Sequence, residues 1–251
     1  MTDLKKDNGV KLNIFQKGFN FSQDGPGNRL VYHLQGCNLR CPWCSNPEGL
    51  ALIGGTAYAV DEVLSEVLRS RMMFFDGGGV TLTGGEVTMQ FNATKILLTL
   101  LKQAQIHTAI ETNGLSPRLP ELFQVVDYLI IDCKHYNPDR HAAVTGLSCR
   151  SAFSNIRAAI TAGKTITLRI PLIGGFNASE TDAKGFADLF DLLGVQNHAD
   201  IELLRYHDYG REKYRKLDMN YTITDGAKVS DESFLAMQTF LRIRGFNLVR
   251  T

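Results

Sequence analysis

Short runs of apolar and β-branched residues alternate along this chain with longer segments in which apolar residues recur at helical spacing. The short runs cover residues 30–35, 80–82, 108–111, 128–132, 165–170 and 201–206 and predict six strands. The helical spacing covers residues 61–71, 92–105, 119–125, 151–162 and 180–193. Strand-then-helix alternation requires right-handed crossovers and gives a parallel sheet with helices on its outer face. The sequence therefore predicts an α/β fold, a partial (β/α)6 barrel of the TIM type.

The size and charge of the chain narrow this prediction. A length of 251 residues suits one barrel of about 250 residues, and no linker or internal repeat divides it, so we expect a single domain over residues 1–251. Hydrophobic residues make up 44%, enough for a large core. The 27 Lys and Arg balance the 26 Asp and Glu, so we expect neither a nucleic-acid partner nor a membrane partner.

The cysteines and the N-terminal segment predict a compartment. The first residues contain no apolar run of signal-peptide length, and no stretch of about 18 apolar residues occurs in the sequence. Three of the five cysteines lie within eight residues, which favours a metal site in a reducing compartment over a disulfide framework. A cytoplasmic location follows. Cys149 opens a predicted helix, where a thiol can be either reactive or inert.

Polar and metal-ligand residues follow every predicted strand. Because the carboxyl ends of parallel strands share one edge, where barrel folds place their active sites, these residues should lie together. They are Gly36 with Cys37, residues 83–86, 111–113 and 132–134, Arg169, and Tyr206 with His207.

Cys37, Cys41 and Cys44 have spacings of four and three residues, so a short loop can wrap all three around one metal group. A structural zinc site would need a fourth ligand, which His33 or His207 could supply from a distance. An iron-sulfur cluster held by three cysteines would instead leave one iron open for chemistry. The residues alone leave both alternatives open, together with a buried thiol cluster.

Two glycine-rich segments accompany the cysteines. Gly84 and Gly85 allow close backbone approach, and Glu86 offers an acceptor for an ammonium group; the alternative is a glycine turn with a solvated glutamate. The segment DGPG at residues 24–27 has turn chemistry and precedes the first predicted strand.

The segment CNLRCPWC at residues 37–44 resembles the CxxxCxxC motif of radical S-adenosylmethionine (SAM) enzymes. Further matches extend the resemblance to nearly the whole chain and to one group, the activating enzymes of glycyl radical enzymes. They are DGPG, QGCNLRCPWCSNPE, GGGVTLTGGE, HTAIETNG, Asp132-Cys133-Lys134, RIPLIGGFN and LLRYHDYGREKY.

The resemblance implies a barrel of the radical SAM type with one 4Fe-4S cluster on Cys37, Cys41 and Cys44. It places one set of residues around SAM: Trp43, Cys44, Ser45, Gly84, Gly85, Glu86, Asp132, Cys133, Lys134, Arg169 and His207. Within this set, Glu86 would receive the methionyl amino group. Strand alternation turns the Cys133 side chain away from its neighbours, which favours a packing role for that thiol. Arg169 could equally be a surface ion pair, and His207 a plain strand-end histidine.

Two weaker assignments also follow from the resemblance. Some relatives use positions that match Glu111, Thr112 and Asp132 for a monovalent cation, to which oxygen ligands are suited. Asp24 is a candidate contact to the partner protein.

The function implied is reductive cleavage of SAM and generation of a glycyl radical on a partner enzyme, such as one of the pyruvate formate-lyase type. An electron donor such as flavodoxin or ferredoxin is expected, and so is a monomer. Many relatives with the CSNPE ending carry a ferredoxin-like insert with additional cysteines. Residues 51–76 contain no cysteine, so a single cluster is expected, and the identity of the partner stays open.

Two other functions are alternatives to the generation of a glycyl radical. One is a radical SAM enzyme that acts on a small molecule, as the deazaguanine-forming relatives do. The other is a zinc-stabilised binding module without catalysis.

Overall fold

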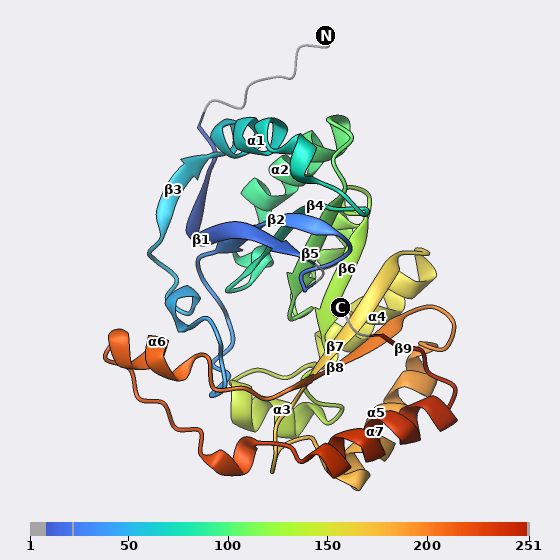
Figure 1. Ribbon diagram of the computed structural model, residues 1–251. Coiled ribbons are helices and arrows are strands. Elements are labelled where there is room, and N and C mark those ends of the chain that lie inside the picture. The colour runs from blue at the N-terminus through green and yellow to red at the C-terminus, as the bar shows by residue number, and fades with distance from the viewer. Residues whose placement is uncertain (1–8, 22, 250–251) are drawn as a thin grey trace.

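One sheet of nine strands runs through the computed structural model, which describes residues 9–21 and 23–249 (Figure 1). The strands are β1 (Lys11–Phe21), β2 (Asn28–Leu34), β3 (Thr56–Ala59), β4 (Gly79–Gly84), β5 (Thr108–Thr112), β6 (Tyr128–Asp132), β7 (Thr165–Leu172), β8 (Asp200–Arg205) and β9 (Leu248–Val249). Their order is β3-β1-β2-β4-β5-β6-β7-β8-β9. From β2 to β9 every neighbouring pair is parallel, whereas β1 pairs antiparallel with both β2 and β3. The sheet curves without closing, so the fold is a partial barrel.

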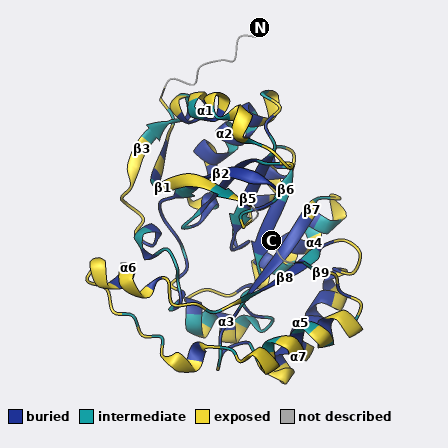
Figure 2. Cartoon of the chain, viewed as in Figure 1, coloured by how far each residue is buried: buried dark blue, intermediate teal, exposed yellow. Residues whose placement is uncertain are grey.

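Helices alternate with the strands of the barrel. They are α1 (Val60–Arg69), α2 (Phe91–Gln103), α3 (Pro138–Thr145), α4 (Arg150–Thr161), α5 (Glu180–Leu193), α6 (Arg211–Lys216) and α7 (Asp231–Ile243). Short 3-10 helices are η1 (Pro47–Gly49), η2 (Arg71–Met73), η3 (Val87–Gln90), η4 (Leu119–Leu122) and η5 (Asp225–Ala227). The central strands are buried, and the outer faces of the helices are exposed (Figure 2).

Helix α5 illustrates how the sequence sets a boundary and a buried face. The Ser179 hydroxyl accepts a hydrogen bond from the backbone of Asp182, whose carboxylate in turn accepts one from the Ser179 backbone. Gly194 ends the helix in the left-handed region, at a φ of 74°. Phe186 and Phe190 are fully buried against the sheet. The apolar stripe of the helix thereby joins the main core.

The six predicted strands are confirmed, each within two residues at its ends, and so are four of the five predicted helices. The α-helix predicted over residues 119–125 is wrong. There the chain forms only η4, with backbone bonds from Glu121 to Arg118 and from Phe123 to Pro120. A turn from Val125 back to Leu122 follows, because the chain must reach β6 within a few residues.

Several elements lie outside the sequence prediction: β1, β3, β9, α3, α6 and α7. Strand β1 alternates between buried and exposed residues only over residues 11–14 and is largely exposed beyond them, so it lacks a strand period. Helix α6 is charged around most of its surface. Within the described part of the chain, no helix has the length and apolar character needed to cross a bilayer.

Candidate functional site

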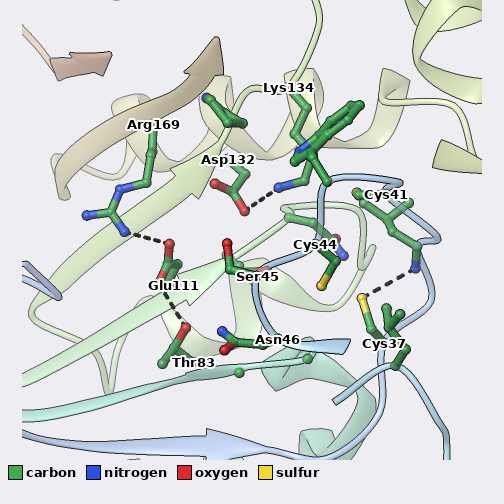
Figure 3. Close-up of a pocket in the computed structure, with 18 of the residues that line it drawn as sticks. Cys37, Cys41, Cys44, Ser45, Asn46, Thr83, Glu111, Asp132, Lys134 and Arg169 are labelled. Carbon is green, nitrogen blue, oxygen red and sulfur yellow. Dashed lines mark hydrogen bonds and ion pairs between the residues drawn. The ribbon is translucent and has the colours of Figure 1, made fainter. Parts of the chain in front are cut away.

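A cavity of about 200 Å³ lies at the carboxyl edge of the sheet (Figure 3). The loop that carries the three cysteines forms one wall, and the ends of β4, β5, β6 and β7 form the others. The predicted site residues that line it are Cys37, Cys41, Trp43, Cys44, Ser45, Gly84, Gly85, Glu111, Thr112, Asp132, Lys134 and Arg169. The fold therefore brings together residues that are up to 132 positions apart in the sequence (from Cys37 to Arg169).

The start of the cysteine loop is held by backbone contacts with the turn after β4. The Glu86 N–H donates to the Gly36 carbonyl at 2.7 Å, and the Gly85 N–H donates to the Leu34 carbonyl at 2.8 Å. A Cβ on Gly85 would lie 2.3 Å from the Gly36 oxygen, so only glycine permits this approach. The close approach to Gly36 thus explains why residue 85 is a glycine without reference to a ligand.

A small apolar cluster supports the loop from beneath. Leu39, Trp43 and Leu50 are buried in it with Phe176, and the rings of Trp43 and Phe176 are 4.9 Å apart. The Leu39 N–H donates to the Cys37 sulfur at 3.4 Å. Backbone donors and a packed underside fix the loop before any cofactor binds, which is the preorganisation that a metal centre requires.

The electrostatics of the thiols call for a cationic group. Burial raises the pKa of Cys37 to about 11 and that of Cys41 to about 12, and it also raises the pKa of Cys44. The thiolate is the metal-binding form, so a bound cationic group would lower these pKa values. The Lys134 ammonium offsets only part of the burial effect.

The three thiols line one cavity, which suits a cluster. Among residues 9–21 and 23–249, no three or more His, Cys, Asp or Glu side chains lie close enough to share one metal ion. A cubane cluster takes each thiolate on a different iron, so its ligands stand further apart than those of a zinc ion. Three thiols around one cavity fit a 4Fe-4S cluster with one open iron.

Two ion pairs line the wall opposite the cysteines. Lys134 Nζ lies 2.7 Å from Asp132, and Arg169 Nη1 lies 2.6 Å from Glu111. Burial would lower the pKa of Lys134, but Asp132, Cys41 and Glu111 together outweigh this effect and hold the pKa above its usual value. Burial likewise would raise the pKa of Glu111, and Arg169 lowers it instead. Glu111, Lys134 and Arg169 are therefore charged at neutral pH, whereas burial raises the pKa of Asp132.

The Glu86 carboxylate is held by hydrogen bonds within the protein. The side chain is 1% exposed and does not line the cavity. Its oxygens accept hydrogen bonds from the Thr88 N–H and hydroxyl (2.9 and 2.6 Å), the Thr112 hydroxyl (2.8 Å) and the Asn113 N–H (2.8 Å). The carboxylate thus supports Thr112 and Asn113, which do line the cavity, while its contact with the methionyl ammonium stays a prediction.

Cys133 and His207 also lie outside the small cavity. Cys133 is buried in the main core, as strand alternation predicted. Its assignment to the cofactor therefore has no geometric support. His207 is exposed and stacks on Tyr209 at 4.0 Å.

A second cavity, of about 950 Å³, continues from the first. The two share Ser45, Asn46, Arg169 and Leu204 in their linings. His207 and Asp24 line the larger one. Burial, and then the nearby Glu111 carboxylate, raise the pKa of Asp24 to about 6.

Two hydrogen bonds and one close backbone approach also support the cysteine loop. The sequence analysis assigned no role to the residues that make them. Asn113 donates to the Asn38 side chain at 2.7 Å, and Lys213 donates to Asn46 at 2.9 Å. A Cβ on Gly210 would lie 2.4 Å from the Cys44 carbonyl oxygen. Their segments were part of the motif matches, but only tertiary contact shows that they hold the cysteine loop.

Comparison with known proteins identifies the family. Residues 31–185 match the model of the radical SAM superfamily. The chain belongs to this superfamily. Its members use a 4Fe-4S cluster and SAM, and three thiols around one cavity fit that chemistry. Membership also removes the zinc-module alternative.

Curated relatives place this radical SAM protein in a narrower group. It is 32% identical to the pyruvate formate-lyase-activating enzyme of Clostridium pasteurianum, over 87% of this chain and 92% of the relative. It is 30% identical to the choline trimethylamine-lyase activating enzyme of Oleidesulfovibrio alaskensis, over 87% and 91%. The protein therefore belongs to the family of glycyl-radical-enzyme activating enzymes.

Solved structures agree with the fold. A domain of a pyruvate-formate lyase-activating enzyme from Bacteroides vulgatus is 26% identical, with a TM-score of 0.56 over 69% of this chain and 98% of that one. A radical SAM methyltransferase from Sphaerobacter thermophilus aligns over 98% of this chain and 74% of its own, with a TM-score of 0.65. At 18% identity the latter shows the fold alone.

Proposed function

We propose that this protein cleaves SAM reductively at a 4Fe-4S cluster and generates a glycyl radical on a partner glycyl radical enzyme, such as one of the pyruvate formate-lyase type. The observation that carries the proposal is that the cavity holding three thiols continues into a larger one beside it. The small cavity suits the cluster and the methionyl end of SAM, and the larger one can admit a protein segment.

The chemistry that the cofactors supply when bound is one-electron cleavage of the SAM sulfonium to methionine and a 5′-deoxyadenosyl radical, which takes a hydrogen atom from a glycine Cα. Cys37, Cys41 and Cys44 would hold the cluster. The Lys134 ammonium is a point charge suited to the SAM carboxylate, and Asp132 fixes its position at 2.7 Å. No side chain has to act as an acid or a base; the protein binds, orients and excludes water.

The remaining SAM contacts are assigned by position. Trp43, Ser45, Gly84, Gly85 and Arg169 line the small cavity and are proposed contacts. His207, in the larger cavity, is proposed for the adenosyl end. The monovalent cation at Glu111, Thr112 and Asp132 has less support, because both carboxylates already pair with cationic side chains.

Further proposals concern the setting of the reaction. A small acidic or iron-sulfur electron carrier such as flavodoxin or ferredoxin would reduce the cluster, and the enzyme would act as a cytoplasmic monomer. One continuous sheet supports a single radical SAM barrel domain over residues 1–251, without a ferredoxin-like insert.

The test is radical formation on a protein. Under anaerobic reducing conditions, the reconstituted enzyme should give a doublet glycyl signal in electron paramagnetic resonance when it is mixed with its cognate glycyl radical enzyme. One methionine and one 5′-deoxyadenosine should form per radical. Many turnovers of a small molecule with no radical on any candidate partner would replace the proposal with the deazaguanine-synthase-like alternative.

A further inference from the structure

Strand β1 leaves part of its edge unpaired. On one side, β2 pairs with β1 along residues 16–21. On the other side, β3 pairs only with residues 11–14. Among the strands that the structure describes, none pairs with residues 16–21 on the side opposite β2, and most of this segment is exposed, as its colouring in Figure 2 shows. An exposed edge presents main-chain N–H and C=O groups to any extended chain that approaches it.

The larger cavity lies against the inner face of β1, beside this edge. Gln16 and Asn20 of β1 line it from one end of the sheet, and Leu204 and Arg205 of β8 and Phe234 of α7 line it from the other. The cavity therefore occupies the opening that the partial barrel leaves between its two ends. At Ser45 and Arg169 it meets the small cavity, where SAM would be cleaved.

Gly18 stands in the middle of the unpaired segment. Since side chains alternate along a strand, Gly18 shares the face of Gln16 and Asn20, which points into the cavity. A Cβ built on Gly18 would meet no atom of the described chain within 4 Å, and its φ lies outside the left-handed region. Neither close packing nor backbone conformation explains a glycine there, although glycine weakens a strand. A glycine in a strand often marks the close approach of another backbone.

We propose that the glycine-bearing segment of the partner enzyme binds as an extended strand along residues 16–21 of β1, with its main chain next to Gly18. The inference rests on the proposed function and deepens it. Alternate N–H and C=O groups of the segment would exchange hydrogen bonds with the β1 edge, as in other cases of strand addition. Recognition would then depend mainly on the partner backbone, and the target glycine would lie at the junction of the two cavities.

A backbone ester scan tests the hydrogen-bond pattern. Peptides with the partner's glycine segment would each carry one amide replaced by an ester, which removes a single N–H donor. Radical formation and the binding affinity of a fluorescent peptide should fall by about 2- to 12-fold at every second position, where a paired N–H is lost, because a net hydrogen bond contributes about 0.5 to 1.5 kcal/mol. Between these positions the loss should be smaller, since the ester there only weakens a carbonyl acceptor. A flat scan on a peptide that does gain a radical would overturn the strand-addition model and leave the proposed function intact.

Protein variants test the place of binding. Gly18→Val fills the space over the strand with a residue that strands favour, so the fold should persist. It should lower affinity for both the peptide and the full partner by about tenfold, with slow SAM cleavage in the absence of partner unchanged. Phe19→Val, on the opposite face of β1, is the matched control and should bind normally.

Hydrogen exchange gives a readout independent of activity. Binding of the partner should slow exchange of alternate amides in residues 16–21. Normal binding by Gly18→Val, or exchange at β1 that the partner leaves unchanged, would refute the proposal. If neither the full partner nor the unmodified peptide gains a radical, the proposed function itself fails and this inference falls with it.

Discussion

At the scale of single residues, the site depends on side chains that never reach the cavity. Glu86 accepts four hydrogen bonds and is 1% exposed, so its carboxylate acts on the site through Thr112 and Asn113. Asn113 in turn holds Asn38 in the cysteine loop at 2.7 Å. The contact of Glu86 with the cofactor stays a prediction, and these hydrogen bonds give Glu86 a positioning role as well.

Glu86→Gln should weaken SAM binding indirectly. The new amide NH2 would face N–H and O–H donors, leaving buried groups unsatisfied at a cost of about 1 to 3 kcal/mol, which should also lower the melting temperature of the cofactor-free protein. In a double-mutant cycle with Thr112→Val, the effects on SAM affinity should be strongly non-additive.

Lys134→Ala is the control variant for the double-mutant cycle with Thr112→Val. Its ammonium is proposed to contact SAM directly, and it donates to Asp132 rather than to Thr112. Its effect on SAM affinity should therefore add to that of Thr112→Val, within about 0.5 kcal/mol. Additive effects for Glu86→Gln as well would speak for a direct contact of Glu86 with the cofactor.

At the scale of elements, the cysteine loop is held by segments distant in the sequence. The turn after β4 packs closely against the start of the loop at Gly85. The segment before α6 packs closely against the end of the loop at Gly210. Gly210 has helical dihedral angles (φ −69°, ψ −28°), so an alanine there would suffer no backbone strain. Its only penalty would come from the Cys44 carbonyl.

Gly210→Ala should therefore displace the end of the cysteine loop. A Cβ at 2.4 Å from the Cys44 oxygen forces a backbone shift, and the bound iron should fall well below that of the unmodified protein after reconstitution. Gly226→Ala is the control, because its Cβ would meet only the Thr224 hydroxyl, at 3.6 Å. Full iron content in Gly210→Ala would mean that α6 can move without affecting the loop.

At the scale of the whole molecule, the partial barrel supplies one metal-binding loop at the carboxyl edge and one wide opening between the sheet ends. The interval between the cysteine loop and β4 holds η1, β3, α1 and η2 and contains no cysteine. Cys133 and Cys149 are buried in separate clusters, Cys133 in the main core and Cys149 in the apolar cluster beneath the cysteine loop.

One cluster per chain follows, with about four irons after anaerobic reconstitution. Iron and acid-labile sulfide analysis measures this directly, and a value near eight irons would contradict it. Cys41→Ala should abolish SAM cleavage while retaining the circular dichroism of the fold, since the main core lies outside the loop. SAM cleavage by this variant would overturn the ligand assignment.

The local pattern of residues was sufficient for the alternating strands, the parallel barrel and the three thiols, because each depends on short-range periodicity or on spacing within one loop. It failed for β1, whose exposed edge has no strand period, and for residues 119–125, where the distance to β6 limits the chain to a 3-10 turn. Three features depend on segments that are remote in sequence. They are the hydrogen bonds that orient Glu86, the close approach of Gly210 to Cys44, and the unpaired edge of β1 beside Gly18. Only the tertiary structure decides these, because each depends on which backbone lies opposite.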